Sequence, residues 1–335
     1  MTVFATHVRG PFFDELHRGQ VFDQAPEVTL NVGLAAAHQA IIGDRMRLPL
    51  SDRLAVEVTG RAGVAHPALV WDVAIGQSTL VTQQVIANLF YRGLSFRRTP
   101  HLGDTLRTTT EVVALRQNQP KAGRPATGLA ALRITTIDQN AHPVLDFWRC
   151  AMLPLSSNDI ETGANDDLDQ VGNEALDLSA QAFAHWDLAT LRDRVGGQHF
   201  SPELLGRTWD VTGGDVVSSA PELARLTLNI ARVHHDATTS PAGRLVYGGH
   251  TIGIALAQLT RAIPNIVGVV AWHRCDHTGP VHEGDTLHSR ITVEKTEPLP
   301  AGGGLVHLRS VVTATGAAAG TPRAVLDWRL VVLMA

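Results

Sequence analysis

The residues best suited to chemistry lie in the second half of the chain. His234 is followed directly by His235 and Asp236, and histidine is the side chain that gains and loses a proton near neutral pH. A metal ion needs at least three converging ligands, and no spacing such as H-E-x-x-H occurs around these residues. We therefore predict no metal site. A lone histidine in a loop is more often a hydrogen-bonded polar residue than a catalyst, so His234 needs support from other residues.

A glycine pair in the segment Tyr247-Gly248-Gly249-His250 stands just before an apolar run. Backbone N–H groups at the start of a helix can stabilise a negatively charged oxygen, and glycine lets that oxygen approach closely. The commoner role of two glycines is to form a tight turn, and the residues alone leave both readings open. In the first half Pro67 takes the place of Gly249 and has no N–H to donate. Any such donor therefore belongs to the second half.

The apolar run at 252–259 predicts the element that would position these glycines. It is apolar on nearly every side, which is typical of a helix buried all round, and here only a curved sheet could bury it. The residues that follow, 287–293, alternate apolar and polar like a strand with one buried face. Each half thus reads as one long helix with an antiparallel sheet. Further strands are expected at 105–115, 128–137, 144–154, 304–314 and 324–334, and further helical regions at 34–42 and 221–231.

The two halves repeat each other. Gly-Asp-Thr-Leu at 103–106 returns at 284–287, and Val-Leu-Asp at 144–146 returns at 325–327. Both pairs have the same separation, which indicates a duplicated domain. Between the copies, the stretch from Ser156 to Asp177 is rich in acidic residues and has no Lys or Arg. We read it as a solvated linker and predict a first domain at 1–155, a linker at 156–180 and a second domain at 181–335.

Composition limits the classes of partner. The chain has 335 residues, 44% of them hydrophobic, a net charge of −4 and a pI near 6.5, so no basic surface for nucleic acid or anionic membranes is expected. The first 20 residues have no apolar core of a signal peptide, and the stretch 245–260 is too short to span a membrane. Cys150 and Cys275 allow at most one disulfide. We expect a cytoplasmic protein that binds a small molecule.

Several enzyme classes lack their motifs. The sequence has no G-x-S-x-G, no G-x-G-x-x-G that opens a helix after a strand, and no G-x-x-x-x-G-K-[ST]. These absences argue against serine hydrolases, Rossmann dehydrogenases and P-loop enzymes.

The duplicated helix and sheet with the G-D-T-L turn resemble the double hotdog arrangement of MaoC-like (R)-specific enoyl-CoA hydratases. The segments 12–20, 43–45, 229–234 and 245–250 further resemble those of mesaconyl-CoA hydratases, also called β-methylmalyl-CoA dehydratases. The resemblance implies an α+β double hotdog fold and a lyase that interconverts a 2-enoyl-CoA and a 3-hydroxyacyl-CoA without a cofactor. It also implies a monomer or a homodimer.

The resemblance also implies roles for individual residues. (R)-hydratases place an Asp and a His five residues apart to hold the attacking water, and the matching positions here are Asn229 and His234. Because an amide cannot titrate, proton transfer would fall to His234 or to its neighbour Asp236. The N–H of Gly249 would stabilise the enolate. The expected substrate-binding residues are Tyr247, Gly248, His250, Asp236 and Arg244, the last for coenzyme A phosphates.

The first copy has a different remnant of this pattern. Asp44 matches the acid, but Pro49 stands five residues later. We expect Asp44 to be structural, capping a turn or pairing with Arg45 or Arg53, and the helix 67–75 to shape an acyl pocket. Two alternatives stay open: a non-catalytic acyl-CoA binding protein, and an acyl-CoA thioesterase that uses Asp236.

Overall fold

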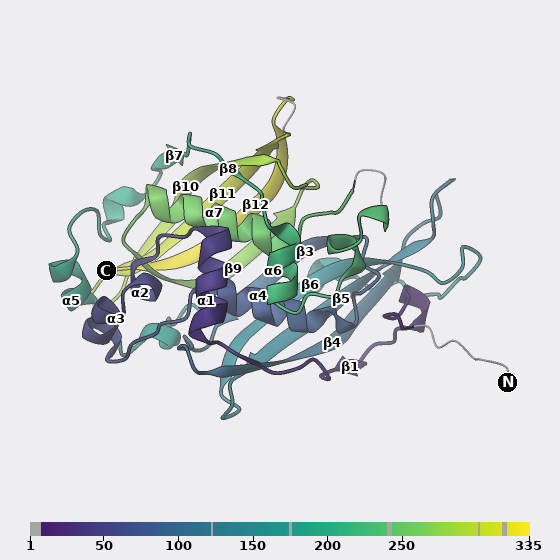
Figure 1. Ribbon diagram of the computed structural model, residues 1–335, viewed down its shortest axis with the longest axis horizontal. Helices are drawn as coiled ribbons and strands as arrows, with labels where there is room; N and C mark the ends of the chain where they lie inside the picture. Colours follow the sequence, from purple (N-terminus) through teal and green to yellow (C-terminus); the bar gives the residue numbers. More distant parts are fainter. Residues whose placement is uncertain (1–7, 122, 174–175, 240–242, 301, 317–319) are drawn as a thin grey trace.

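The computed structural model describes residues 8–121, 123–173, 176–239, 243–300, 302–316 and 320–335 (Figure 1). The helices are α1 Val32–Ile42, α2 Arg47–Leu50, α3 Asp52–Thr59, α4 Pro67–Gln77, α5 Leu188–Arg194, α6 Ala220–Leu226 and α7 Gly248–Ala262. The strands are β1 Val21–Phe22, β2 Val28–Thr29, β3 Ala87–Phe96, β4 Thr105–Gln117, β5 Thr127–Ile137, β6 Pro143–Pro154, β7 Thr208–Asp210, β8 Asp215–Val216, β9 Ile266–His277, β10 Thr286–Pro298, β11 Gly304–Thr315 and β12 Arg323–Met334. Single 3-10 turns include η2 Ser78–Leu80, η3 Leu168–Gln170, η4 Gln181–Phe183 and η6 Arg232–His234.

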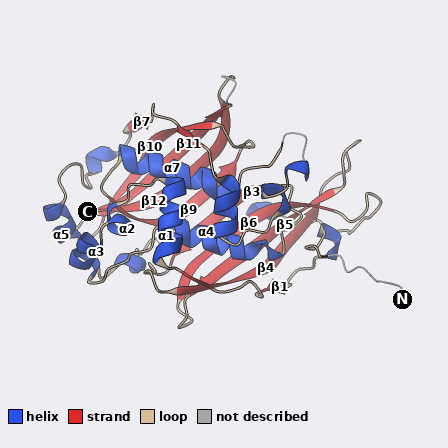
Figure 2. Ribbon diagram, in the orientation of Figure 1, coloured by secondary structure: helices blue, strands red, loops and turns tan. Residues whose placement is uncertain are grey.

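One antiparallel sheet runs through both copies in the order β1-β4-β5-β6-β3-β9-β12-β11-β10-β7. β3 of the first copy pairs with β9 of the second, so the two sheets are continuous. Figure 2 shows α4 and α7 lying side by side against this sheet. The predicted α+β double hotdog fold is confirmed. Sequence reasoning did not predict β3 and β9; β9 is buried over its first seven residues, and such a strand lacks the alternation that identifies a half-buried one.

Equivalent residues of the two copies are separated by the same number of residues in the structure as in the sequence repeat. Gln77 donates from its amide to the carbonyl of Leu106 at 3.0 Å, and Gln258 does the same to Leu287 at 2.8 Å. α4 begins at Pro67 and α7 at Gly248, which is the separation of the two G-D-T-L turns. Pro67 therefore corresponds to Gly248, and our placement of it opposite Gly249 was one residue off.

The helix before the candidate site residues is shorter than predicted. α6 ends at Leu226, whereas we expected helix over 221–231. Leu228 then adopts a left-handed conformation with φ of 59°, which cannot continue a right-handed helix. The chain turns there and delivers Asn229 into the space between the copies.

The acidic segment is not a free linker where the structure describes it. Arg92 of β3 donates to the carbonyls of Leu168 and Val171 at 3.1 Å each, and the carboxylate of Asp166 accepts from the N–H of Leu115 at 2.8 Å. Leu168 is buried against the sheet. The segment thus packs on the sheet because its carbonyls and carboxylates meet donors there. Glu174, one of the acidic residues noted in the sequence, lies outside the described residues.

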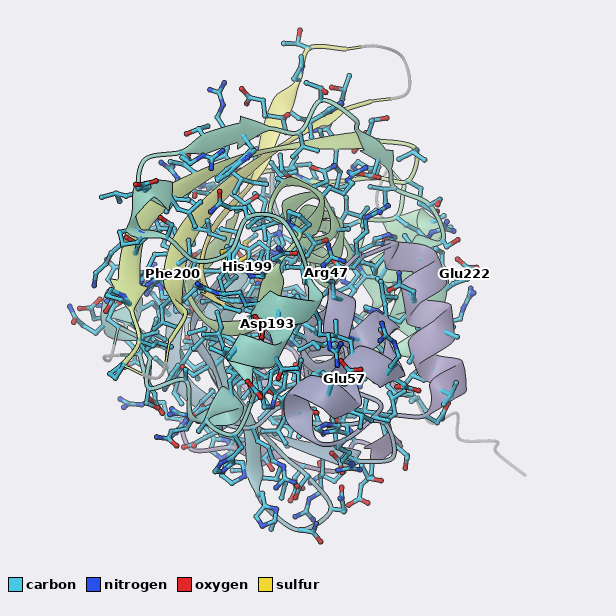
Figure 3. The ribbon with its side chains drawn as sticks, turned by 90° about the vertical axis from the view of Figure 1, so that its left-hand side faces the viewer. Arg47, Glu57, Asp193, His199, Phe200 and Glu222 are labelled. Carbon is cyan, nitrogen blue, oxygen red and sulfur yellow. The ribbon has the colours of Figure 1, made fainter. Side chains whose placement is uncertain are left out.

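Residues 181–194 pack against the first copy as well as the second, although our predicted boundary assigns them to the second domain. The N–H of Asp187 donates to the carbonyl of Val58 at 2.7 Å, and Arg194 pairs with Glu57 at 2.8 Å. Figure 3 looks onto this end of the molecule and shows Asp193 on α5 next to Glu57 on α3. The start of the second domain at 181 stays a prediction.

Candidate active site

A cavity of about 310 Å³ lies between the two copies. The second copy supplies the loop 229–234, the segment 245–248 and the end of β9. The first copy supplies the turn after α4, the start of β3 and one residue of β6. The polar or glycine residues that line it are Thr79, Thr82, Asn88, Tyr91, Arg149, Asn229, His234, Tyr247, Gly248, Thr251, His277, Thr278 and Gly279.

His234 has the proton arrangement of a base. Its Nδ1–H donates to the carbonyl oxygen of Leu245 at 2.8 Å, so the neutral ring carries no proton on Nε2. Burial lowers the pKa of His234 to about 4, although the hydrogen bond to Leu245 opposes this shift. The ring of Tyr247 packs edge-on against it, with centroids 5.8 Å apart. His234 is therefore neutral at neutral pH and has a free acceptor nitrogen.

Asn229 presents a donor instead of a carboxylate. Its Oδ1 accepts the N–H of Ala231 at 3.0 Å, which leaves the amide NH₂ to donate. The loop is held by the first copy, because the N–H of Ile230 donates to Thr79 Oγ1 at 3.0 Å. His235 donates from Nε2 to the Asn229 carbonyl at 2.6 Å. It therefore stabilises the loop, whereas the adjacent His234 lines the cavity.

The start of α7 supplies backbone donors. Gly248 is its first residue, and the first N–H groups of a helix have no partner within it. A Cβ on Gly248 would lie 2.6 Å from His277 Nε2, and one on Gly249 would lie 2.1 Å from Asp72 Oδ1. A side chain at Gly248 would therefore displace the His277 ring, and one at Gly249 would press on Asp72. Gly248 lines the cavity, whereas Gly249 is not among the described lining residues.

A buried carboxylate of the first copy fixes this helix start. Tyr247 donates from its hydroxyl to Asp72 Oδ1 at 3.0 Å, and Asp72 Oδ2 lies 3.1 Å from His38 Nε2. All three side chains are buried. Burial, reinforced by the nearby Asp72, raises the pKa of Tyr247 well above its usual value. Tyr247 therefore stays a neutral donor and positions the start of α7.

Three predicted site residues lie elsewhere. Asp236 is at the surface, where it bonds Thr238 and pairs with Arg232 at 3.1 Å, and Arg244 pairs with Glu283. His250 is buried, with a pKa lowered to about 4 by burial, and its Nδ1 finds no partner among the described residues. None of the three is among the described lining residues.

Sequence reasoning missed several polar residues of the cavity, among them Tyr91 of β3, Arg149 of β6 and His277 at the end of β9. A signal for them is present in the sequence, because the residues 181 positions away in the other copy are Trp272, Leu330 and Phe96. When one copy has a polar residue and the other has an apolar residue at the equivalent position, the shared fold does not require the polar side chain.

The equivalent space in the first copy is closed. It measures about 10 Å³ and is lined by Met46, Pro49, Pro67 and Phe96, with Phe183 and Trp186 from the segment between the copies packed into it. The helix α4, which we expected to shape an acyl pocket, is wholly buried. Among its described residues only Pro67 contacts that closed space, and none lines the open cavity.

Asp44 is structural and caps a turn, which is one of the two roles predicted for it. Its Oδ1 accepts the N–H of Met46 at 2.6 Å, and its Oδ2 accepts the hydroxyl of Thr260 at 3.1 Å. His66 Nε2 lies 3.0 Å from Oδ1. Burial raises the pKa of Asp44, but these partners outweigh burial and the net pKa is lowered.

The arginine partners predicted for Asp44 were wrong. Arg53 pairs with Glu57 at 3.5 Å. Arg45 uses its backbone N–H on Thr260 Oγ1 at 3.3 Å. Asp44 is thus held by groups of both copies without an arginine.

Neither a membrane helix nor a metal site is found among the described residues. No helix in that part of the chain is long and apolar enough to cross a bilayer. No group of three or more His, Cys, Asp or Glu side chains there could hold a metal ion. Cys150 and Cys275 are both free and buried.

The chain is similar to two solved structures over nearly its whole length. A conserved hypothetical protein from Mycobacterium tuberculosis with a double hotdog fold is 56% identical, covers 98% of this chain and 100% of its own, and superposes with a TM-score of 0.92. A protein described as a MaoC domain dehydratase from Chloroflexus aurantiacus is 25% identical, with 99% of each chain covered and a TM-score of 0.81. No protein-family model matches the chain. The chain belongs to the proteins with a double hotdog fold, and it is similar to a MaoC domain dehydratase.

Two curated relatives narrow the comparison. β-Methylmalyl-CoA dehydratase from Chloroflexus aurantiacus is 28% identical over 320 residues, 91% of this chain and 88% of the relative. Mesaconyl-CoA hydratase from Cereibacter sphaeroides is 27% identical over 317 residues, 92% of this chain and 90% of the relative. The predicted resemblance to mesaconyl-CoA hydratases is thereby confirmed.

Proposed function

We propose that this protein is a hydratase or dehydratase that interconverts a 2-enoyl-CoA and a 3-hydroxyacyl-CoA in the cavity between its two copies. The observation that carries the proposal is the convergence of three residues on one cavity: His234 with its free Nε2, Asn229 with its amide NH₂, and Gly248 at the start of α7. The names of the two curated relatives, both enzymes of CoA thioesters, support it.

In the hydration direction, a water between Asn229 and His234 is the nucleophile. The water oxygen accepts from the Asn229 amide, while one water proton faces His234 Nε2. The oxygen bonds to C3 of the enoyl group as the O–H bond breaks and the C2–C3 π bond opens. The released proton passes by way of His234 to C2, which completes the 3-hydroxyacyl thioester and restores the base.

The thioester oxygen carries the negative charge that develops in this step. The N–H groups at the start of α7, with Gly248 closest to the cavity and Gly249 behind it, would stabilise that oxygen. Asp72 and Tyr247 hold the helix start in place. The strength of His234 as a base is modest, because burial lowers its pKa to about 4, but the same shift makes its proton easy to return to C2.

Coenzyme A would enter from an outer hollow of about 630 Å³ that shares Val85, Ile86, Val233, Leu245 and Pro280 with the cavity. Arg232 lines this hollow and is an exposed cation suited to phosphate. A single chain contains the whole site, so a monomer is sufficient. The free and buried Cys150 and Cys275 suit the reducing cytoplasm that we propose as its location.

The test is turnover of a panel of 2-enoyl-CoA thioesters, followed by loss of the enoyl-thioester absorbance, in the wild type and in His234→Gln. We expect His234→Gln to lower kcat by about 10²–10⁴-fold, because it removes the proton carrier. Pro49→Ala, at the matching position of the first copy, should leave turnover unchanged. A folded wild type that binds the thioesters without consuming any of them would instead identify a binding protein. Release of free thiol would identify a thioesterase.

A further inference from the structure

A second hollow of the molecule is rich in arginine. It measures about 610 Å³ and is lined by the loop of Asp44, by the start of α3 and by the end of α5 (Figure 3). The arginines that line it are Arg45, Arg47, Arg53 and Arg194. Because the whole chain has a net charge of −4, this cluster differs from the average charge of the protein. The proposed function makes no use of it.

Arg45 and Arg47 are the unbalanced charges of this hollow. Arg47 donates from Nε to the Pro264 carbonyl at 3.2 Å and to Asn265 Oδ1 at 3.1 Å. These bonds hold the side chain and leave its terminal NH₂ groups able to donate. Arg45 is exposed, and its backbone N–H bonds Thr260. Among the described residues, neither guanidinium forms an ion pair with Asp or Glu.

The carboxylates near the hollow do not balance the cluster. Glu57 is a single carboxylate between two arginines, 3.5 Å from Arg53 and 2.8 Å from Arg194. Asp44 lines the hollow, but it is buried and its oxygens accept hydrogen bonds from groups of the fold. A guanidinium matches a phosphate group with two parallel N–H donors. Four arginines around one hollow therefore favour a ligand with more than one phosphate.

The hollow is the equivalent, in the first copy, of the outer hollow of the second copy. Arg47 and Arg232 occupy the same position in the two matching loops. The N–H of Arg232 donates to the carbonyl of Gln83 at 2.9 Å. Pro264, whose carbonyl accepts from Arg47, lies 181 positions after Gln83. The volumes are about 610 Å³ and about 630 Å³. Both copies thus have an arginine-lined hollow of similar size.

The first copy has no room for an acyl group behind its hollow. Met46 and Pro49 of the same loop line the closed space, which measures about 10 Å³. A ligand of the hollow therefore cannot extend inwards. Leu50 is 53% exposed and lines the hollow together with Leu54, so an apolar surface lies beside the arginines. Charged and apolar groups of this kind suit a nucleotide, which has phosphates at one end and a flat base at the other.

We propose that this hollow is a second, non-catalytic binding site for a nucleotide with two or more phosphates. Arg45 and Arg47 bind the phosphates, and the base lies against Leu50. A free nucleoside diphosphate and the nucleotide end of coenzyme A share this chemistry. The site goes beyond the proposed function because it lies outside the catalytic cavity; only the comparison with the coenzyme A hollow rests on that function.

Calorimetric titration of the full-length protein with ADP and with coenzyme A tests the proposal. We expect at least one of the two to have a site that Arg45→Gln weakens about tenfold or more, because hydrogen bonds to a charged group are lost. Arg45→Lys should keep part of the affinity. Arg232→Gln, in the hollow of the second copy, and Arg107→Gln, an exposed arginine on β4, should leave this site unchanged. If Arg45→Gln weakens no site for either ligand, the proposal is wrong.

The ligands also identify the source of the nucleotide. ADP binding that Arg45→Gln weakens would support a free nucleoside diphosphate. A second coenzyme A per chain that Arg45→Gln removes, without ADP binding, would support the nucleotide end of coenzyme A. Inorganic pyrophosphate should bind at least about fivefold more weakly than the nucleotide, because it has no base to pack on Leu50. Equal affinity for pyrophosphate would reduce the hollow to a simple anion site and overturn the proposal.

The proposed function and this inference fail in different ways. ADP and pyrophosphate contain no thioester, so their binding does not depend on turnover. Arg45→Gln should leave the turnover of enoyl thioesters unchanged, and His234→Gln should leave the nucleotide site unchanged. A protein that binds a nucleotide at Arg45 but hydrates no thioester would disprove the hydratase and support the second site. A protein that hydrates thioesters but has no nucleotide site sensitive to Arg45→Gln would disprove the second site alone.

Discussion

The open cavity, which holds the loop of Asn229 and His234, and the closed space, which holds the matching loop of the first copy, are built from the same fold, yet they measure about 310 Å³ and about 10 Å³. The cavity is lined by Tyr91, Arg149 and His277, and the residues 181 positions away are the apolar Trp272, Leu330 and Phe96, of which Phe96 lines the closed space. It also has the donor Gly248 where the closed space has Pro67. One of the two equivalent spaces is open and lined by polar residues, and the other is closed and apolar.

Asp44 is the exception to this pattern. It is a carboxylate in the first copy, whereas the matching residue at the open cavity is the amide Asn229. Asp44 Oδ1 accepts the N–H of Met46, and Asn229 Oδ1 accepts that of Ala231. This shared bond shapes the loop in both copies. The remaining atoms differ, since Asp44 Oδ2 is taken by Thr260 whereas the Asn229 NH₂ is available to the cavity. At matching positions, the carboxylate of Asp44 therefore stabilises the fold, and the amide of Asn229 is the group that the proposed mechanism uses.

The closed space depends on an aromatic plug, and its removal should give the largest effect on stability. Phe183 is buried, packs edge-on against Trp186 at 4.8 Å and lies close to Gly268. Phe183→Ala should lower the free energy of unfolding by about 3–5 kcal/mol, because it opens a cavity. Urea denaturation measures this. The exposed His185→Ala should change it by less than about 0.5 kcal/mol.

Turnover distinguishes the plug from a part of the active site. In Phe183→Ala, at a temperature where the variant is folded, kcat should equal that of the wild type. A large loss of kcat in the folded variant would show that the two spaces are coupled, and the comparison would break.

Exchanging the helix starts tests where the backbone donor lies. Gly248→Pro copies the first copy's Pro67 and removes the N–H of a residue that lines the cavity, while proline is well accepted as the first residue of a helix. We expect kcat to fall by about 10²–10³-fold. Pro67→Gly should leave kcat unchanged and cost about 0.5–1 kcal/mol of stability.

A third variant separates the donor from the packing around it. Gly248→Ala keeps the N–H but presses on His277, whose Nε2 lies 2.6 Å from the added Cβ. A milder loss than in Gly248→Pro supports the donor. Equal losses in the two variants would assign the effect to the displaced His277 instead.

The sequence predicted the duplication, the fold and the segments of the site, because these depend on local patterns and fixed spacing. It did not predict which glycine lines the cavity. An error of one residue in the start of the helix is enough to exchange the positions of Gly248 and Gly249. It also could not show that Asp236 and Arg244 face surface partners. Nor could it show that Arg149 and His277 reach the site from β6 and β9, because these contacts form only when distant strands pair.

The loop residues Asp44 and Asn229 should have opposite phenotypes when each is changed to alanine. Asp44→Ala leaves the Met46 N–H and the Thr260 hydroxyl without their acceptor, which should lower the free energy of unfolding by about 3 kcal/mol without changing kcat. Asn229→Ala should lower kcat at least about tenfold, because the water loses its donor. If Asp44→Ala lowers kcat in the folded protein, the closed copy contributes to catalysis.

His277 of the cavity should make the free energy of unfolding depend on pH. Phe96, which lines the closed space at the matching position, cannot have this effect. Burial lowers the pKa of His277 to about 4, below an unfolded value of about 6.5. The neutral folded form therefore contributes stability that is fully present above pH 6.5 and is lost as the pH falls towards 4, because the unfolded chain binds the proton first. Between pH 8 and pH 5 this loss is about 2 kcal/mol. His277→Phe, which copies Phe96, should remove that part of the difference in urea stability between the two pH values. If His277→Phe leaves the difference unchanged, the pKa of His277 is not lowered in the folded protein. Its burial then contributes nothing to the pH dependence of the free energy of unfolding.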